Sequence, residues 1–196
     1  MPIAYGDESF REHSEHGFYV LTGVVFEPRM LDEAHETLLS LKGRRQKLHW
    51  HGMDAAEQQR VVKKLADLEG MHIVVIGSPV PLQKQERARA MCLNQLVVEL
   101  FVVELYSLGI DLLVLEGRSP DLNQRDLRTV AGARQRLLPK AAKFRVDHSP
   151  GDAQPLLWAA DIVAGVCRAA HLGKTEHREM LANRVYDVEI STGCHP

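Results

Sequence analysis

Short apolar runs with strand character alternate with longer segments of helical spacing along this chain. Residues 3–8 and 18–27 are typical of two strands joined by a polar loop, which favours an antiparallel hairpin. Residues 29–42 and 54–69 place their apolar side chains at helical spacing, and Asp54 is a suitable N-cap for the second of these helices. Both helices fall between the hairpin and the next predicted strand.

The second half of the chain alternates strands with helices. Strands are predicted at 72–80, 111–117 and 142–148, and helices at 83–108, 122–138 and 154–171. Such alternation favours parallel pairing with right-handed crossovers, in contrast to the antiparallel hairpin. The expected fold is therefore an α/β mixed five-stranded sheet with helices on both faces and a helical insert after the second strand, at about 29–69. This is the element order of the ribonuclease H-like fold.

Length and composition narrow the class of protein. A chain of 196 residues suits one domain, 1–196, with an extension at about 174–196 that contains a helix and the strand-like VYDVEI and could serve a homodimer interface. The net charge of −2 excludes a globally basic nucleic-acid coat. We find no apolar run of about 18 residues, no signal-peptide pattern, and only three widely spaced cysteines. We therefore expect a cytoplasmic protein without membrane contacts.

Three acidic residues fall where this fold would bring them together. Asp7 ends the first predicted strand and Glu116 ends the fourth, and ligands of open α/β sheets bind where such strand ends meet. Asp161 lies in a helix that is apolar nearly all round, where a charge is costly unless it is paired, hydrogen-bonded or bound to a metal. The alternative is a structural role for Asp161, with Arg168 as its partner or with its stripe of the helix exposed to solvent.

The functional hypothesis is a divalent-metal site. Mg²⁺ and Mn²⁺ prefer carboxylate oxygens, and two such ions can activate a water and stabilise the leaving oxygen of a phosphodiester. Asp7, Glu116 and Asp161 are the predicted catalytic metal ligands. Strand alternation turns Glu8 away from Asp7, although Glu8 remains a candidate catalytic residue. The candidates for a fourth ligand are Glu8, Glu99 and Glu104.

A basic connector, KGRRQKLHWH, occupies residues 42–51. Arg44, Arg45 and Lys47 are candidates for phosphate contacts, Trp50 for stacking on a base, and His49 for positioning substrate or moving a proton. The alternative is a solvated connector with Trp50 anchored in the core. A second basic cluster, expected to flank the same crevice, comprises Arg134, Arg136, Lys140, Lys143 and Arg145.

Four segments carry a family resemblance: AYGDES, YVLTGVVF, LHW at 48–50 and QPLLWAADIVAGVCRAA. Together they resemble the domain of unknown function 3800 family over roughly residues 3–171. Phe10 replaces the glycine that usually follows Asp-Glu-Ser, and Gln154 and Asp161 stand further apart than in the family motif. The resemblance implies a ribonuclease H-like fold, a metal-dependent nuclease activity, and functional roles for Asp7, Glu8, Gln154 and Asp161. It supports Glu116 more weakly, because ribonuclease H-like enzymes more often have Asp there.

The expected function is divalent-metal-dependent hydrolysis of RNA or DNA phosphodiesters. Mg²⁺ or Mn²⁺ is the expected cofactor and nucleic acid the expected partner, with Gln154 orienting Asp161 or the substrate. Two alternatives remain open at this point. The first is a non-catalytic module on the same fold that binds nucleic acid or protein through its basic clusters. The second is a metal-dependent hydrolase of small phosphoesters.

Overall fold

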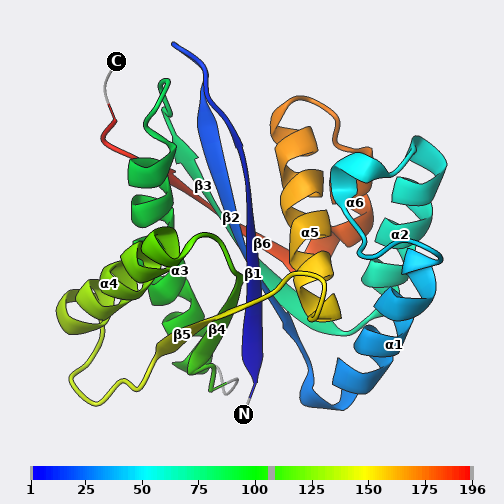
Figure 1. Ribbon diagram of the computed structural model, residues 1–196, viewed down its shortest axis with the longest axis horizontal. Coiled ribbons are helices and arrows are strands. Elements are labelled where there is room, and N and C mark those ends of the chain that lie inside the picture. The colour runs from blue at the N-terminus through cyan, green and yellow to red at the C-terminus, as the bar shows by residue number, and fades with distance from the viewer. Residues whose placement is uncertain (1, 106–108, 195–196) are drawn as a thin grey trace.

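The computed structural model describes residues 2–105 and 109–194, and its elements follow the predicted order (Figure 1). The strands are β1 (Ile3–Arg11), β2 (Phe18–Phe26), β3 (Gly70–Ser78), β4 (Leu112–Glu116), β5 (Arg145–Ser149) and β6 (Val185–Ser191). The α-helices are α1 (Leu31–Lys42), α2 (Ala55–Asp67), α3 (Gln85–Leu105), α4 (Pro120–Leu137), α5 (Pro155–His171) and α6 (Glu176–Leu181). The short 3-10 helices are η1 (Pro28–Met30), η2 (Trp50–Gly52) and η3 (Ala182–Arg184).

The sheet is mixed and has six strands in the order β5-β4-β1-β2-β3-β6, which corrects the expected five. The hairpin β1–β2 and the pair β2–β3 are antiparallel, whereas β1–β4, β4–β5 and β3–β6 are parallel. The sixth strand comes from the tail, where VYDVEI pairs along β3. Without it, β3 would present a row of unpaired backbone groups, which β6 covers.

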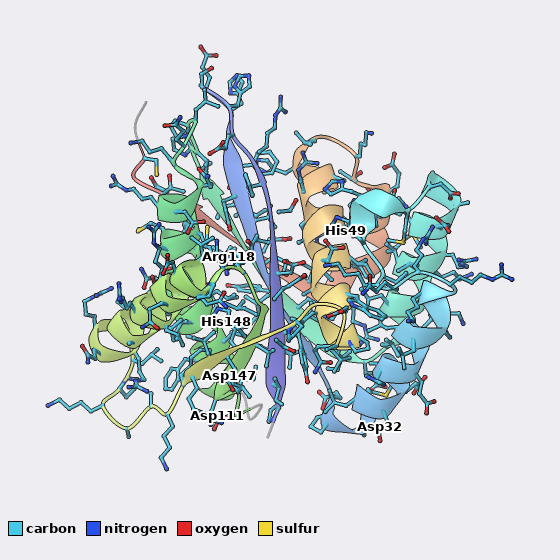
Figure 2. The ribbon with its side chains drawn as sticks, viewed as in Figure 1. Asp32, His49, Asp111, Arg118, Asp147 and His148 are labelled. Carbon is cyan, nitrogen blue, oxygen red and sulfur yellow. The ribbon has the colours of Figure 1, made fainter. Side chains whose placement is uncertain are left out.

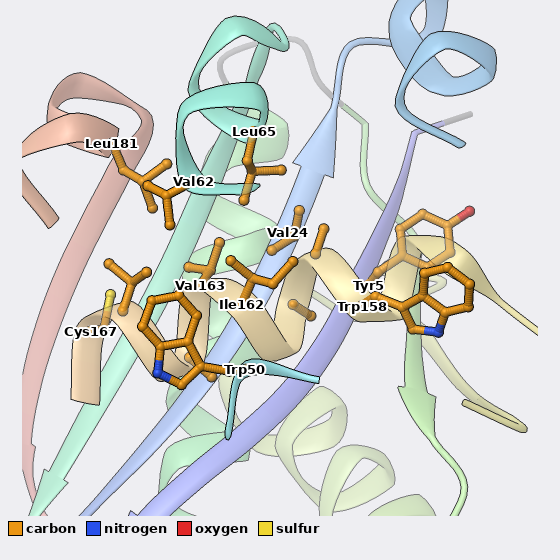
Figure 3. Packing of buried hydrophobic residues seen from close by; sticks show 14 of the residues in the cluster. Tyr5, Val24, Trp50, Val62, Leu65, Trp158, Ile162, Val163, Cys167 and Leu181 are labelled. Atoms are coloured by element: carbon orange, nitrogen blue, oxygen red, sulfur yellow. The ribbon is translucent and has the colours of Figure 1, made fainter. Parts of the chain in front are cut away.

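Helices cover both faces of the sheet, as the alternating second half predicts (Figure 1). On one face α3 and α4 pack over a cluster that includes Leu21, Val75 and Leu113. On the other face α5 packs directly on β1 and β2, and α1, α2 and α6 lie outside it. The helix α5 is apolar nearly all round because it lies between the sheet and this outer layer (Figure 3).

The helical insert forms part of that outer layer. The helix α2 begins with a capping box, in which the Asp54 side chain accepts the N–H of Glu57 and the Glu57 side chain accepts the N–H of Asp54. Val62 and Leu65 of α2 then face the same core as α5 (Figure 3). The insert therefore holds the connector 43–49 over the face of the sheet on which α5 lies.

Two predictions about helices can be compared with the described residues. In residues 2–105 and 109–194 no helix is both long and apolar enough to cross a membrane. The long helix predicted at 83–108 is described as α3 up to Leu105, and its last three predicted residues lie outside the described part.

A buried histidine makes the fold sensitive to acid. His72 of β3 is fully buried against Phe26, and within the described chain neither of its ring nitrogens has a hydrogen-bond partner. Burial lowers the pKa of His72 to about 4, because the charged imidazolium would have no water around it.

We expect His72 to reduce the free energy of unfolding as the pH falls from 7 to 4.5. Its folded-state pKa lies below the ordinary value of 6.5, so its contribution is full above pH 6.5 and is lost as the pH falls towards 4. The loss by pH 4.5 is about 2–3 kcal/mol at 1.36 kcal/mol per pKa unit. In urea unfolding over the same pH interval, the free energy of unfolding of His72→Leu should fall by about 2–3 kcal/mol less than that of wild type. The exposed control His16→Gln should behave as wild type. Equal losses in wild type and His72→Leu would contradict this.

Candidate metal centre

The point where β4 separates from β1 places two of the acids side by side. The parallel ladder between these strands ends at the pair Gly6 and Leu115, and Asp7 and Glu116 are the next residues of the two strands. In contrast to the expectation, β1 does not end at Asp7 but continues to Arg11, paired with β2. The site therefore lies at the opening between two diverging strands rather than at two strand ends.

The third acid reaches this opening from α5. The hydroxyl of the buried Thr22, opposite Asp7 in the sheet, lies 3.0 Å from the Asp7 carbonyl oxygen and 3.2 Å from the Ala160 carbonyl oxygen. It holds α5 against the hairpin one residue before Asp161. The structure thus brings Asp7, Glu116 and Asp161 together from three separate elements.

The carboxylates are close enough to affect one another. Burial raises the pKa of Asp7 well above its usual value, and the negative charges of Glu8, Asp161 and Glu116 raise it further. The N–H of Glu8 donates to Asp7 Oδ1 at 2.8 Å, and this hydrogen bond lowers the pKa of Asp7. Asp7 is therefore surrounded by negative charges, and a cation beside it would favour its ionised form.

The connector supplies one cation. Lys47 Nζ donates to Glu116 Oε1 at 2.7 Å. Burial opposes ionisation of Lys47, but its hydrogen bond to Glu116 and the charges of Glu116, Asp7 and Asp161 outweigh burial and raise the pKa of Lys47. One ammonium is thus bound to Glu116, within electrostatic reach of Asp7 and Asp161.

Trp50 fixes the connector in this position. Its ring is 5 % exposed and lies on Gly165 of α5, where an added Cβ would approach the ring to 2.2 Å (Figure 3). Its backbone N–H donates to Asp161 Oδ2 at 2.6 Å, and His49 Nδ1 lies 3.1 Å from both Asp161 oxygens. Trp50 is therefore a core anchor, which corrects the hypothesis that it is free to stack on a base.

A glycine in the β5–α5 loop leaves room for Glu116. An added Cβ at Gly151 would lie 2.2 Å from Glu116 Oε1, so a larger residue would displace the carboxylate. The Trp158 Nε1–H donates to the Gly151 carbonyl oxygen at 2.6 Å and holds the loop there.

Glu8 faces the opposite side of the sheet and is not brought to the three acids. It forms an ion pair with Arg89, which is 1 % exposed and donates to both oxygens of Asp126 at 2.9 and 2.8 Å. Burial opposes ionisation of Asp126, but hydrogen bonds from His148 and Arg89 lower its pKa overall. Figure 2 shows His148 and Arg118 on the side of α4, whereas His49 lies beside α5. Nothing in the sequence marks this network, because Arg89 lies in the charged stretch KQERAR at 84–89.

The remaining predicted residues have local partners or lie apart. Gln154 is the N-cap of α5, where its Oε1 accepts the N–H of Leu156, and it stands two helical turns from Asp161. Arg45 pairs with Glu57 at 2.8 Å, and Arg44 is exposed. Glu99 accepts a hydrogen bond from Gln95 on α3, which packs on the opposite face. The side chain of Glu104 lies outside the described residues.

The acids match a divalent metal ion in donor type and charge but do not form a finished ligand sphere. Among the described residues, no three His, Cys, Asp or Glu side chains are placed so that they could hold a metal ion. The Lys47 ammonium occupies one side of Glu116, and Trp50 and His49 engage Asp161. Binding a metal would require Glu116 to exchange the ammonium for the ion.

The structure resembles that of a known protein only distantly. No family model and no curated protein matches the sequence. Among solved structures, a chain from the complex of PCNA and RNase HII of Archaeoglobus fulgidus is 12% identical, with a TM-score of 0.49, over 90% of this chain and 77% of that chain. A likeness this distant does not establish a shared activity, so the candidate site has to be judged on its own geometry.

We expect Arg89→Met to lower the free energy of unfolding by about 3–5 kcal/mol, because it leaves Asp126 and Glu8 without their buried partner. The matched control is Glu86→Gln, which removes the more exposed partner of Arg118 and should change stability by at most about 1 kcal/mol. Urea unfolding at pH 7 measures both. A change below 1 kcal/mol in Arg89→Met would show that the network contributes little.

In metal-free protein at pH 7, Asp7→Asn should raise the Tm, because it removes a carboxylate that is buried among other negative charges. The expected rise is about 2–4 °C for each kcal/mol by which this charge destabilises the fold. The folded-state pKa of Asp7 is raised, so its ionised form destabilises the fold above that pKa and the penalty vanishes below about pH 4. The difference from wild type should therefore fade on acidification. Glu36→Gln, on the exposed side of α1, should leave the Tm unchanged. A lower Tm for Asp7→Asn would refute the charge-repulsion account.

Proposed function

We propose that the three acids bind Mg²⁺ or Mn²⁺ and that the protein hydrolyses phosphodiester bonds of RNA or DNA on a ribonuclease H-like fold. One observation carries the proposal: Asp7, Glu116 and Asp161 approach one another from β1, β4 and α5, and all three charges raise the pKa of Lys47, which is hydrogen-bonded to Glu116. The strand order β3-β2-β1-β4-β5 within the sheet is consistent with such a fold. Membership of the domain of unknown function 3800 family is part of the same proposal.

The proposed roles follow from where the side chains lie. Asp7, Glu116 and Asp161 would hold the ion, which lowers the pKa of a water and offsets the charge of the phosphate. Lys47, released from Glu116 when the ion binds, would turn to a phosphate oxygen, and the exposed Arg44 would contact the next one.

His49 is the candidate for moving a proton. Its side chain is 52% exposed, and Nδ1 is engaged with Asp161, which leaves Nε2 directed to other partners. In hydrolysis, water oxygen bonds to phosphorus and gives up a proton to the solvent, the bond from phosphorus to the leaving oxygen breaks, and the leaving oxygen takes a proton. His49 Nε2 would give that proton.

The test combines metal binding with cleavage. Mn²⁺ at a hundred times its Kd should stabilise the wild type by about 2.7 kcal/mol, and Asp161→Asn and Asp7→Asn should lose this stabilisation. Cleavage of a labelled oligonucleotide should fall by about a hundredfold or more in both variants, since even residues around metal ligands contribute 10–100-fold. Glu36→Gln is the charge-matched control for both measurements. Full cleavage by Asp7→Asn would overturn the assignment.

One observation favours a second candidate, a non-catalytic nucleic-acid-binding module. The acids already have partners in the chain: Lys47 for Glu116, and Trp50 and His49 for Asp161. Such a module would show no Mn²⁺ shift in wild type, and its salt-sensitive affinity for nucleic acid would be indifferent to chelator. The thermal titration therefore separates the two functions.

A further inference from the structure

The segment between Asp126 and Asp147 concentrates positive charge. It contains no Asp or Glu, whereas its cations are Arg128, Arg134, Arg136, Lys140, Lys143 and Arg145. In a chain of net charge −2 this is a local excess. The segment forms the second half of α4, the connector to β5 and the first two residues of β5.

Four of these cations line a hollow of about 770 Å³ at the edge of the sheet, which we call the basic hollow: Arg134, Lys140, Lys143 and Arg145. All four are exposed, and none forms an ion pair with any described acid. Arg134 at the end of α4 offsets the helix dipole. That explanation does not extend to Lys140, Lys143 and Arg145, which follow the helix.

The hollow lies at the far end of β5 from the acids, which corrects the expectation that these cations flank the same crevice. Arg145 pairs in register with Leu112, and Ser149 pairs with Glu116. Paired residues of neighbouring strands share a face, so Arg145 and Ser149 face the same side as Glu116. Four residues of strand at about 3.3 Å each separate the hollow from the acids by about 13 Å.

We propose that the basic hollow binds phosphates of the same nucleic-acid strand that is cleaved at the acids. The nucleic acid would run along β5 from Arg145 to Ser149, which pairs with Glu116 of β4. At the rise of about 3.4 Å per nucleotide along the axis of a stacked strand, about four nucleotides span that distance. The proposal deepens the proposed function by naming how the substrate is held.

The alignment with the acids favours nucleic acid over an acidic protein, because a polymer with evenly spaced charges can contact both places. A small polyphosphate would fill the hollow but could not reach Glu116. The charge that opposes this path is Asp147, which lies between Arg145 and Ser149 on the same face. Figure 2 shows Asp147 on β5.

The test measures binding of a labelled single-stranded 12-mer by fluorescence anisotropy in chelator, where nothing is cleaved. Substituting Lys140, Lys143 and Arg145 by Gln should lower the affinity at least tenfold at low salt. It should also reduce the slope of log K against log salt by about 2, at about 0.7 for each of three lost phosphate contacts. The matched control replaces three exposed cations of α2, Arg60, Lys63 and Lys64, by Gln and should keep the slope. Asp147→Asn should raise the affinity.

Three results would overturn the proposal: an unchanged slope in the hollow variant, an equal loss in the α2 control, or binding of pyrophosphate but not of the 12-mer. Cleavage in Mn²⁺ is a separate readout, in which the hollow variant should have a higher KM for the 12-mer at unchanged kcat. If no cleavage occurs in wild type, the proposed function fails while the binding result still decides on the hollow.

Discussion

Three carboxylates that share a partly buried opening need a cation among them, and much of this structure can be understood from that requirement. Asp7 lies nearest the core, and its pKa is raised by burial and by its acidic neighbours. The Lys47 ammonium reaches the group only because Leu48 and Trp50 bury the connector on either side of His49. Trp50 can be buried there only because Gly165 leaves its face of α5 without a side chain. The helical insert thus bears directly on the electrostatics of the site.

Alternation along β1 separates two polar systems that are adjacent in sequence. Asp7 faces α5 and an opening that Lys47 fills, whereas Glu8 faces α3 and a buried arginine. Arg89 satisfies Glu8 and Asp126 together, and His148 and Arg118 complete the partners of Asp126. A carboxylate engaged in this way is expensive to remove from its partner. The family resemblance assigns one function to the pair Asp7 and Glu8, but the two side chains lie in different chemical environments.

Periodicity was sufficient to predict the elements, because an apolar face has the same spacing wherever the helix or strand packs. It also predicted that Asp7, Glu116 and Asp161 would approach one another, since parallel strands and a buried helix leave few arrangements. It could not predict the Lys47 contact with Glu116 or the pairing of Arg89 with Asp126, and it left open whether Trp50 stacks on a base or is anchored in the core. Each of these depends on which residues of distant segments meet. The place of the sixth strand could not be predicted for the same reason: VYDVEI is strand-like, but its pairing is set by the free edge of β3.

The exchange of Lys47 for a divalent ion connects the two halves of the proposed mechanism. In the absence of a divalent ion, the Lys47 ammonium is paired with Glu116 and is not available to a phosphate. If Glu116 held a metal ion, Lys47 would lose its hydrogen bond to that carboxylate, and its ammonium would be free to contact a phosphate of the substrate. The connector that supplies Lys47 would then also bind substrate, with Trp50 still anchored on α5 and Asp161 still accepting the Trp50 N–H. Metal and substrate would therefore bind with positive coupling through one side chain rather than through a movement of the fold.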